Sequence, residues 1–187
     1  MGKHAVKASD DSLNFYENNS FYIYGGIDET LPKNIIVPFI NAVQKQKGKV
    51  EKGELHIYIS SSGGMVQYGL DLIAHIEDAI KNEITVNTYV TSTACSCASL
   101  IAVTGSVRYV APRAYHLLHF ARGWEYVHNP VMAERNLENW IFMQDQIVAH
   151  YKKYTKLKGI PAKLLADNFM INGAADLIKN GLADYEM

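Results

Sequence analysis

The sequence is poor in cysteine, in unbalanced charge and in long apolar runs. Its 187 residues include only two cysteines, Cys95 and Cys97, and 18 basic residues stand against 19 acidic ones. Two cysteines with a single residue between them make a poor disulfide framework, so a reducing cytoplasm is expected. The charge balance argues against a nucleic-acid partner, and no run of charge points to a membrane surface.

Apolar stretches are too short for a membrane protein. No run approaches the roughly 20 residues that a transmembrane helix needs. The first 20 residues, MGKHAVKASDDSLNFYENNS, have no apolar core, so they are not expected to be a secretory signal. With 48% hydrophobic and 20% charged residues, the composition is that of an ordinary globular domain.

The pattern of apolar residues predicts one domain at 20–187 after a mobile N-terminal segment at 1–19. Alternation and buried runs predict strands at 21–27, 55–60, 84–90, 107–110 and 115–120. Helical spacing predicts helices at 31–46, 65–80, 94–103, 131–157 and 174–179, with a short one near 161. Strands that alternate with helices favour an α/β fold with parallel pairings. The long helix at 131–157 follows the last core strand and is expected to project and pack against a neighbouring subunit.

A glycine pair follows the strand at 55–60 and precedes a helix, in the segment I-S-S-S-G-G-M at 59–65. Glycine lets the backbone turn sharply and approach a ligand closely. Amides at a helix N-terminus can also bind an anion or a developing oxyanion. The alternative is a plain strand-to-helix turn, which glycine also favours.

Ser96 lies in the segment T-A-C-S-C-A-S-L, at the predicted start of a helix. A nucleophilic serine benefits from this place, because nearby amides can stabilise a tetrahedral oxyanion. The alternative is a helix N-cap, a role that Ser92, Thr93 or Ser99 could also take.

Two histidines, His116 and His119, lie three residues apart in an apolar strand and should point to opposite faces. One side chain is expected to face the interior, and the other is expected to face solvent or a partner. The C-x-C and H-x-x-H spacings suggest metal ligands, but neither pair converges easily on one ion, so no metal is expected. Asp167, in the segment L-A-D-N-F-M, is a helix cap or the third member of a Ser-His-Asp triad.

These segments together resemble the proteolytic subunit of Clp protease (the ClpP family) over roughly residues 20–185. S-S-S-G-G-M is similar to the family's N-S-P-G-G-x-V, and T-A-C-S-C-A-S to Q-A-A-S-M-G-A. R-Y-V-A-P-R-A-Y-H-L-L-H resembles R-x-x-L-P-N-S-R-V-M-I-H, and D-N-F-M with G-L-A-D resembles D-x-F-M/L with Y-G-L-I/V-D.

The resemblance implies a serine endopeptidase that needs no cofactor. It assigns the nucleophile to Ser96, the general base to His119 and the orienting acid to Asp167. The oxyanion hole would be the backbone N–H groups of Gly64 and Cys97. It also implies a crotonase/ClpP-like spiral of stacked βαβ turns with the long helix as a handle.

The same resemblance implies particular partners. Family members form homo-oligomeric rings of seven subunits, stack the rings in pairs, and receive unfolded protein substrates from an AAA+ ATPase unfoldase.

Several positions depart from the family pattern. Ser62 replaces the loop proline, the bulky segment A-R-G-W-E-Y-V-H-N at 121–129 replaces a glycine-rich substrate strand, and Leu165-Ala166 replaces a charged pair between rings. Two alternatives to a peptidase therefore stand beside the main prediction. One is a non-proteolytic enzyme of the same spiral fold acting on acyl-CoA, and the other is a regulatory ring subunit that co-assembles with a conventional paralogue.

Overall fold

A computed structural model describes residues 13–121, 130–157 and 168–187. In this part of the chain, eight strands form one mixed sheet with the path β1-β2-β3-β4-β5-β8, while β6 pairs with β4 and β7 pairs with β6. The strands are β1 (Asn14–Glu17), β2 (Ser20–Ile23), β3 (Leu55–Ser61), β4 (Val86–Cys95), β5 (Val107–Val110), β6 (Tyr115–Leu118), β7 (Phe169–Asn172) and β8 (Tyr185–Glu186). The helices are η1 (Pro32–Ile36), α1 (Val37–Gln46), α2 (Val66–Lys81), α3 (Cys97–Thr104), α4 (Pro130–Tyr154) and α6 (Ala174–Lys179).

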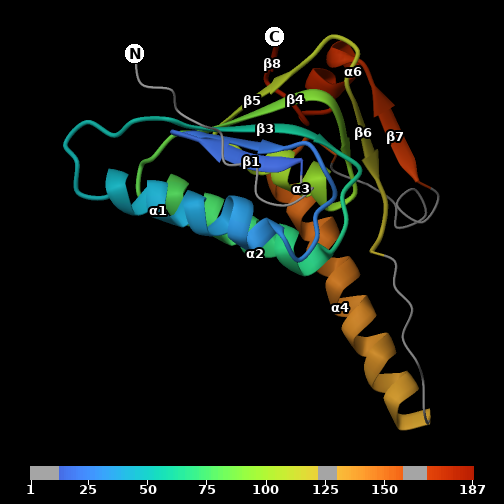
Figure 1. The fold of residues 1–187 in the computed structure, drawn as a ribbon. Helices are drawn as coiled ribbons and strands as arrows, with labels where there is room; N and C mark the ends of the chain where they lie inside the picture. Colours follow the sequence, from blue (N-terminus) through green and yellow to red (C-terminus); the bar gives the residue numbers. More distant parts are fainter. Residues whose placement is uncertain (1–12, 122–129, 158–167) are drawn as a thin grey trace.

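The predicted α/β class is confirmed. Strands β2, β3, β4 and β5 pair in parallel, and a helix lies between each strand and the next along the chain. Figure 1 shows α1, α2 and α3 together on one side of the sheet. The inward side chains of β3, Leu55, Ile57 and Ile59, are fully buried against this helical layer.

Strand β4 is the central strand and is longer than the sequence predicts. Its first half pairs with β5 and its second half, from Thr93 to Cys95, pairs with β6. Ala94 and Cys95 are small and apolar and therefore suit the predicted helix at 94–103. The hydrogen bonds to β6 hold them in the strand instead, so the change from strand to helix falls at Ser96.

The opposite face of the sheet carries a row of aromatic rings. Cross-strand neighbours on the path from β1 to β8 are stacked or tilted against each other with centroids 4.5–5.7 Å apart. The six residues of this aromatic row are Phe15, Tyr22, Tyr58, Tyr89, Tyr109 and Tyr185. Each strand on the path therefore contributes one ring.

The N-terminal segment is more ordered than predicted in its last part. Residues 1–19 were expected to be mobile, but β1 pairs antiparallel with β2 and the Asn14 side chain is buried. Asn14 donates to the carbonyl of Gly26 and accepts from the amide of Gly25, at 2.8 and 2.9 Å. A polar side chain thus holds this strand, which is why hydrophobic periodicity missed it.

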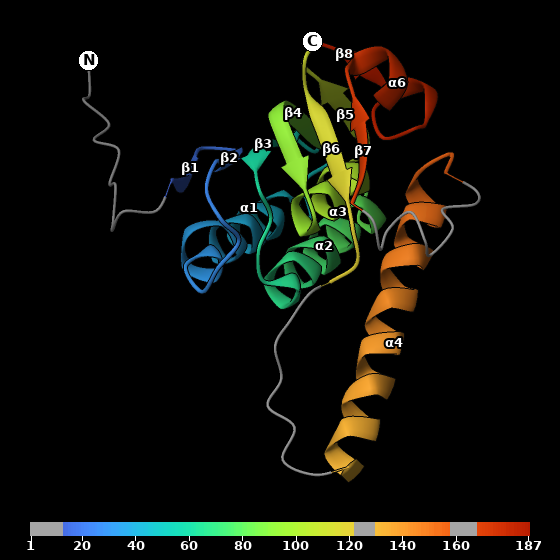
Figure 2. The same ribbon diagram turned by 90° about the vertical axis from the view of Figure 1, so that its right-hand side faces the viewer.

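Helix α4 projects from the layered core, as predicted (Figure 2). Near its C-terminal end, Ile147 and Tyr151 are buried in the core. Toward its N-terminal end, Val131, Leu137, Ile141 and Phe142 are each more than half exposed. The short helix expected near residue 161 lies outside the described residues.

Candidate active site

Three strands that carry candidate residues end at the same edge of the sheet. β3 leads into the glycine loop, β4 ends at Cys95 just before Ser96, and β6 ends at Leu118 just before His119. Because β3 and β6 both pair in parallel with β4, their carboxyl ends lie together. The topology therefore gathers residues that are far apart in the sequence.

Ser96 is held in a conformation that few non-glycine residues adopt. Its backbone angles are φ 56° and ψ −129°, and its side chain makes no capping hydrogen bond to α3. Its amide donates to the carbonyl of Leu117 at 2.7 Å, which extends the β4–β6 pairing by one bond. A serine on a strained turn between strand and helix is typical of a presented nucleophile. The N-cap alternative is not what the structure shows.

The glycine loop lies directly against Ser96. A Cβ atom added to Gly63 would come within 2.5 Å of the Cys95 carbonyl oxygen and 2.8 Å of the Ser96 Cβ. Gly63 also has a φ of +86°, in the left-handed region that glycine tolerates. The loop therefore needs glycine at this position for its backbone to lie beside Ser96.

Hydrogen bonds to Ile27 fix the direction of the Gly64 amide. The Ile27 amide donates to the Gly63 carbonyl at 2.9 Å, and the Met65 amide donates to the Ile27 carbonyl at 2.7 Å. In a trans peptide the N–H points opposite to the preceding C=O, so the Gly64 N–H points away from Ile27. The Gly64 carbonyl also points away from Ile27 and accepts a hydrogen bond from the Cys97 thiol, at 3.5 Å.

Cys97 begins α3, and its amide is the second candidate donor for an oxyanion. The first hydrogen bonds of this helix run from Ser99 and Leu100 to the Ser96 carbonyl, so the Cys97 amide has no acceptor within the helix. Burial raises the pKa of the Cys97 thiol to about 11, so the thiol is protonated at neutral pH and does not compete with Ser96 as a nucleophile. Ser96, Gly64 and Cys97 thus lie close together, while their roles in catalysis stay a prediction.

His119 is half-buried and lies at the same edge, but no hydrogen bond joins its ring to the Ser96 hydroxyl among the described residues. Its Nδ1 lies 2.5 Å from the Phe120 carbonyl oxygen. A carbonyl only accepts, so this nitrogen carries the proton and Nε2 is free to accept one. Asp167 lies outside the described residues, so its place in a triad stays a prediction.

The two histidines of the H-x-x-H spacing face different surroundings, as predicted. The His116 side chain is fully buried, while His119 is partly exposed. In the part of the chain that the structure describes, no three His, Cys, Asp or Glu residues gather as metal ligands.

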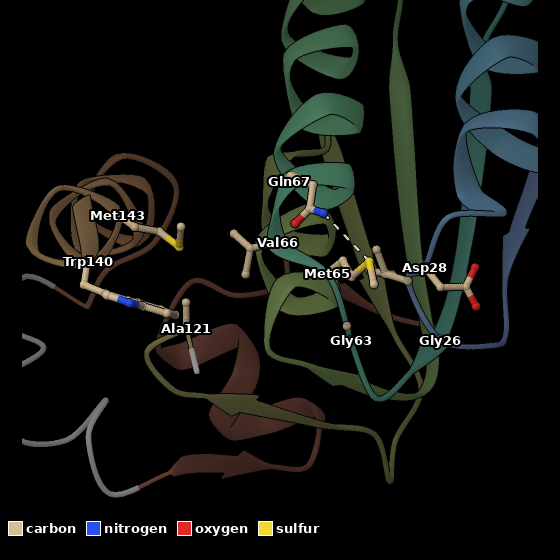
Figure 3. A pocket seen from close by; sticks show the side chains of 11 residues that line it. Gly26, Asp28, Gly63, Met65, Val66, Gln67, Ala121, Trp140 and Met143 are labelled. Atoms are coloured by element: carbon tan, nitrogen blue, oxygen red, sulfur yellow. Dashed lines mark hydrogen bonds between the residues drawn. The ribbon is translucent and has the colours of Figure 1, made fainter. Parts of the chain in front are cut away.

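A cavity of about 510 Å³ opens beside the glycine loop. Gly63 and Val66 line one side, and Trp140 and Met143 of α4 line the other (Figure 3). Gly64 is also among the lining residues. Sequence reasoning missed Trp140 and Met143, because the 3.6-residue periodicity of α4 does not show which face lies beside the loop. The cavity walls are largely apolar, which suits an apolar side chain next to the loop amides.

A model of the Clp protease family matches residues 3–185 of the chain. No match was found among curated proteins. Among the described residues, no helix is long and apolar enough to cross a bilayer. The family match covers nearly the whole sequence, including the described parts of the site.

Proposed function

The chain belongs to the Clp protease family, and from this premise we propose that it is a serine endopeptidase with Ser96 as its nucleophile. Proteins of this family act on protein substrates and usually form oligomers. The observation that carries the proposal is the strained turn at Ser96, which lies against a glycine loop whose Gly64 amide is directed away from Ile27.

In the proposed reaction, Ser96 Oγ attacks the carbonyl carbon of the scissile peptide bond. His119 Nε2 takes the hydroxyl proton and then gives it to the leaving amine, so that an acyl-enzyme forms. The negative charge on the carbonyl oxygen is stabilised by the N–H groups of Gly64 and Cys97. Water, activated by the same imidazole, then hydrolyses the ester and regenerates the serine.

We propose Asp167 as the group that orients His119. The Phe120 carbonyl is a second acceptor for the same Nδ1 proton, at 2.5 Å. Asp167→Asn separates the two roles. If Asp167 orients the ring and stabilises its charged form, this variant loses about 10⁴-fold in kcat. If the Phe120 carbonyl serves alone, kcat stays near that of the wild type.

The proposed substrates are unfolded polypeptides with an apolar side chain beside the scissile bond. The cavity next to Gly64 supports this preference, because Val66, Trp140 and Met143 form its walls. Proteolysis inside a ring chamber would restrict access to unfolded chains. We propose that the chain forms such a homo-oligomer, a ring of seven subunits. The family resemblance also implies an AAA+ unfoldase as its partner.

The exposed apolar residues of α4 support assembly through this helix. Leu137 is 60% and Phe142 67% exposed, on the part of α4 that projects from the core. Burial against a second copy would remove this apolar surface from water. The role of α4 as a contact between subunits is therefore part of the proposal.

The test is labelling of the intact protein with a fluorophosphonate, followed by identification of the modified peptide. We expect the label on Ser96 and loss of both labelling and peptide hydrolysis in Ser96→Ala. Ser92→Ala is the matched control, because Ser92 is exposed on the same strand and takes no part in the site. Undiminished hydrolysis in Ser96→Ala would reject the proposal, and acyl-CoA turnover in its place would favour the acyl-CoA alternative.

A further inference from the structure

A second serine–histidine pair lies behind the candidate active site. Ser99 Oγ and His116 Nδ1 are 2.8 Å apart, and both side chains are fully buried. The Nε2 of His116 is buried too and has no hydrogen-bond partner among the described residues. The proposed reaction uses neither residue, so this buried polar pair calls for a separate explanation.

The pair joins the two elements that carry Ser96 and His119. Ser99 lies in the first turn of α3, and its amide donates to the Ser96 carbonyl at 3.0 Å. His116 lies in β6, opposite Ala94 of β4, and is three residues before His119. The side-chain hydrogen bond therefore connects α3 to β6 one turn behind the nucleophile and three residues before the base.

The proton positions follow from the surroundings of the imidazole. Burial, with a smaller contribution from the charge of Arg108, lowers the pKa of His116 to about 3, so the ring is neutral at pH 7. A proton on Nε2 would leave a buried donor without an acceptor, so we place it on Nδ1, where it is donated to Ser99 Oγ. The Ser99 hydroxyl then keeps its own proton to donate, and the buried phenol of Tyr151 is the acceptor we assign to it.

We propose that Ser99 and His116 are positioning residues, whose hydrogen bond sets the separation between the Ser96 hydroxyl and the His119 imidazole. In the same proposal, the buried phenol of Tyr151 on α4 accepts from the Ser99 hydroxyl and holds it in place. The inference rests on the proposed function, because it assigns these residues a role in that reaction.

The buried hydrogen bond between Ser99 and His116 can strongly affect the reaction rate because it limits how α3 is oriented relative to β6. The β4–β6 backbone bonds fix the strands, but they leave the rotation of α3 about its axis to side-chain contacts. Ser96 immediately precedes α3, so a small rotation of the helix moves its hydroxyl relative to His119. A misplacement of about 1 Å costs on the order of 100-fold in rate.

The experiment compares two substitutions of similar shape at position 99. Ser99→Thr keeps the hydroxyl, and Ser99→Val replaces it with a methyl group. We expect Ser99→Val to lower both kcat for a fluorogenic peptide and the rate of fluorophosphonate labelling by about 10- to 100-fold, with KM little changed. Ser99→Thr should restore most of the loss.

Tyr151→Phe is the second variant, because it adds no atoms and is the least disruptive to folding. We expect it to lower kcat several-fold at constant KM. Thr104→Val is the matched control. It also removes a hydroxyl that links α3 to α4, because Thr104 Oγ1 lies 3.0 Å from His150 Nε2. This contact is at the end of α3 that is far from Ser96. It should react at the wild-type rate, even if it melts at a lower temperature.

Failure of this inference is distinct from failure of the proposed function. Wild-type kcat and labelling rates in folded Ser99→Val or Tyr151→Phe would overturn it, while wild-type labelling at Ser96 would leave the peptidase proposal intact. A wild-type protein that is not labelled at Ser96 would overturn both. A melting temperature lowered with unchanged kinetics would show that the pair is structural only.

Discussion

At the scale of single residues, two glycines with the same φ angle allow a controlled test of the loop. Gly63 and Gly48 both have a φ of +86°, but only Gly63 is crowded. A Cβ at Gly63 would meet the Cys95 carbonyl and Ser96, whereas nothing lies within 4 Å of a Cβ at Gly48. The two alanine variants share the strain and differ in the contact with the site.

We expect Gly63→Ala to lower kcat by about 100-fold, because the added methyl group pushes the Gly64 amide away from Ser96. Gly48→Ala should cost about 1 kcal/mol of stability and leave kcat unchanged. Steady-state kinetics and thermal unfolding of both variants check this. Equal kinetic losses in the two variants would contradict a specific role for the loop.

The buried imidazole of His116 predicts a dependence of stability on pH. Its pKa is lowered to about 3 in the fold, against an ordinary value of 6.5. Below pH 6.5 the unfolded chain binds a proton that the folded protein does not, so the free energy of unfolding falls as the pH falls. The fall approaches about 1.4 kcal/mol per pH unit and continues until the folded protein also binds the proton.

Urea unfolding at pH 7, 6 and 5 measures this effect, with His116→Val as the comparison. The variant lacks the titrating group, so its stability should decline less steeply by about 1 kcal/mol per pH unit. The lowered pKa of His150, also caused by burial, acts in the same direction and remains in both proteins. Parallel pH profiles for the two proteins would refute the prediction.

The role of Ser96 is decided by contacts that its local sequence does not contain. The local sequence places Ser96 at the start of a helix, but it does not show whether the serine is a helix cap or a nucleophile. The positive φ of Ser96 and the absence of a capping bond distinguish the two, and both depend on the β4–β6 pairing. The hydrogen bond between Ser99 and His116 joins residues on a helix and a strand, so neither local pattern indicates it.

At the scale of elements, Arg108 at the start of β5 connects the end of α4 to the C-terminal segment. Its Nε and Nη2 donate to the Asp184 carboxylate at 2.9 and 2.6 Å. Its Nη1 donates to the carbonyls of Tyr154 and Gly181, at 2.6 and 2.7 Å. One guanidinium therefore satisfies acceptors of three residues in two segments.

We expect Arg108→Met to destabilise the protein by about 2–3 kcal/mol, because a partly buried carboxylate and two carbonyls lose their donor. Arg113→Met is the control, since Arg113 is exposed, and it should cost less than about 0.5 kcal/mol. Chemical unfolding measures both. A loss no larger than that of the control would show that solvent replaces these bonds.

Element prediction succeeded where a pattern was strong and failed where tertiary contacts decide. The alternation at Leu55–Ser61 and the helical spacing in α2 were enough to predict both elements. Strands β7 and β8 were missed because they are four and two residues long and exist only through pairing with β6 and β5. The end of β4 was misplaced because its small residues suit either a helix or a buried strand.

At the scale of the whole molecule, the projecting part of α4 predicts self-association. Leu137, Ile141 and Phe142 are all more than half exposed on it. We expect Leu137→Glu together with Phe142→Glu to shift the assembly to smaller species in native mass spectrometry, because charge opposes burial of this surface. Val50→Glu is the control, since Val50 is fully exposed in a loop away from α4 and should leave the assembly unchanged.

The aromatic row has a consequence for how the sheet keeps its alignment. Its rings occupy directly opposed positions, such as Tyr22 with Tyr58 and Tyr58 with Tyr89. A slip of one residue between two strands would turn a ring toward the helices and an aliphatic side chain toward water. A slip would break the stacked pairs, so the aromatic row favours the native register of the strands as the sheet forms.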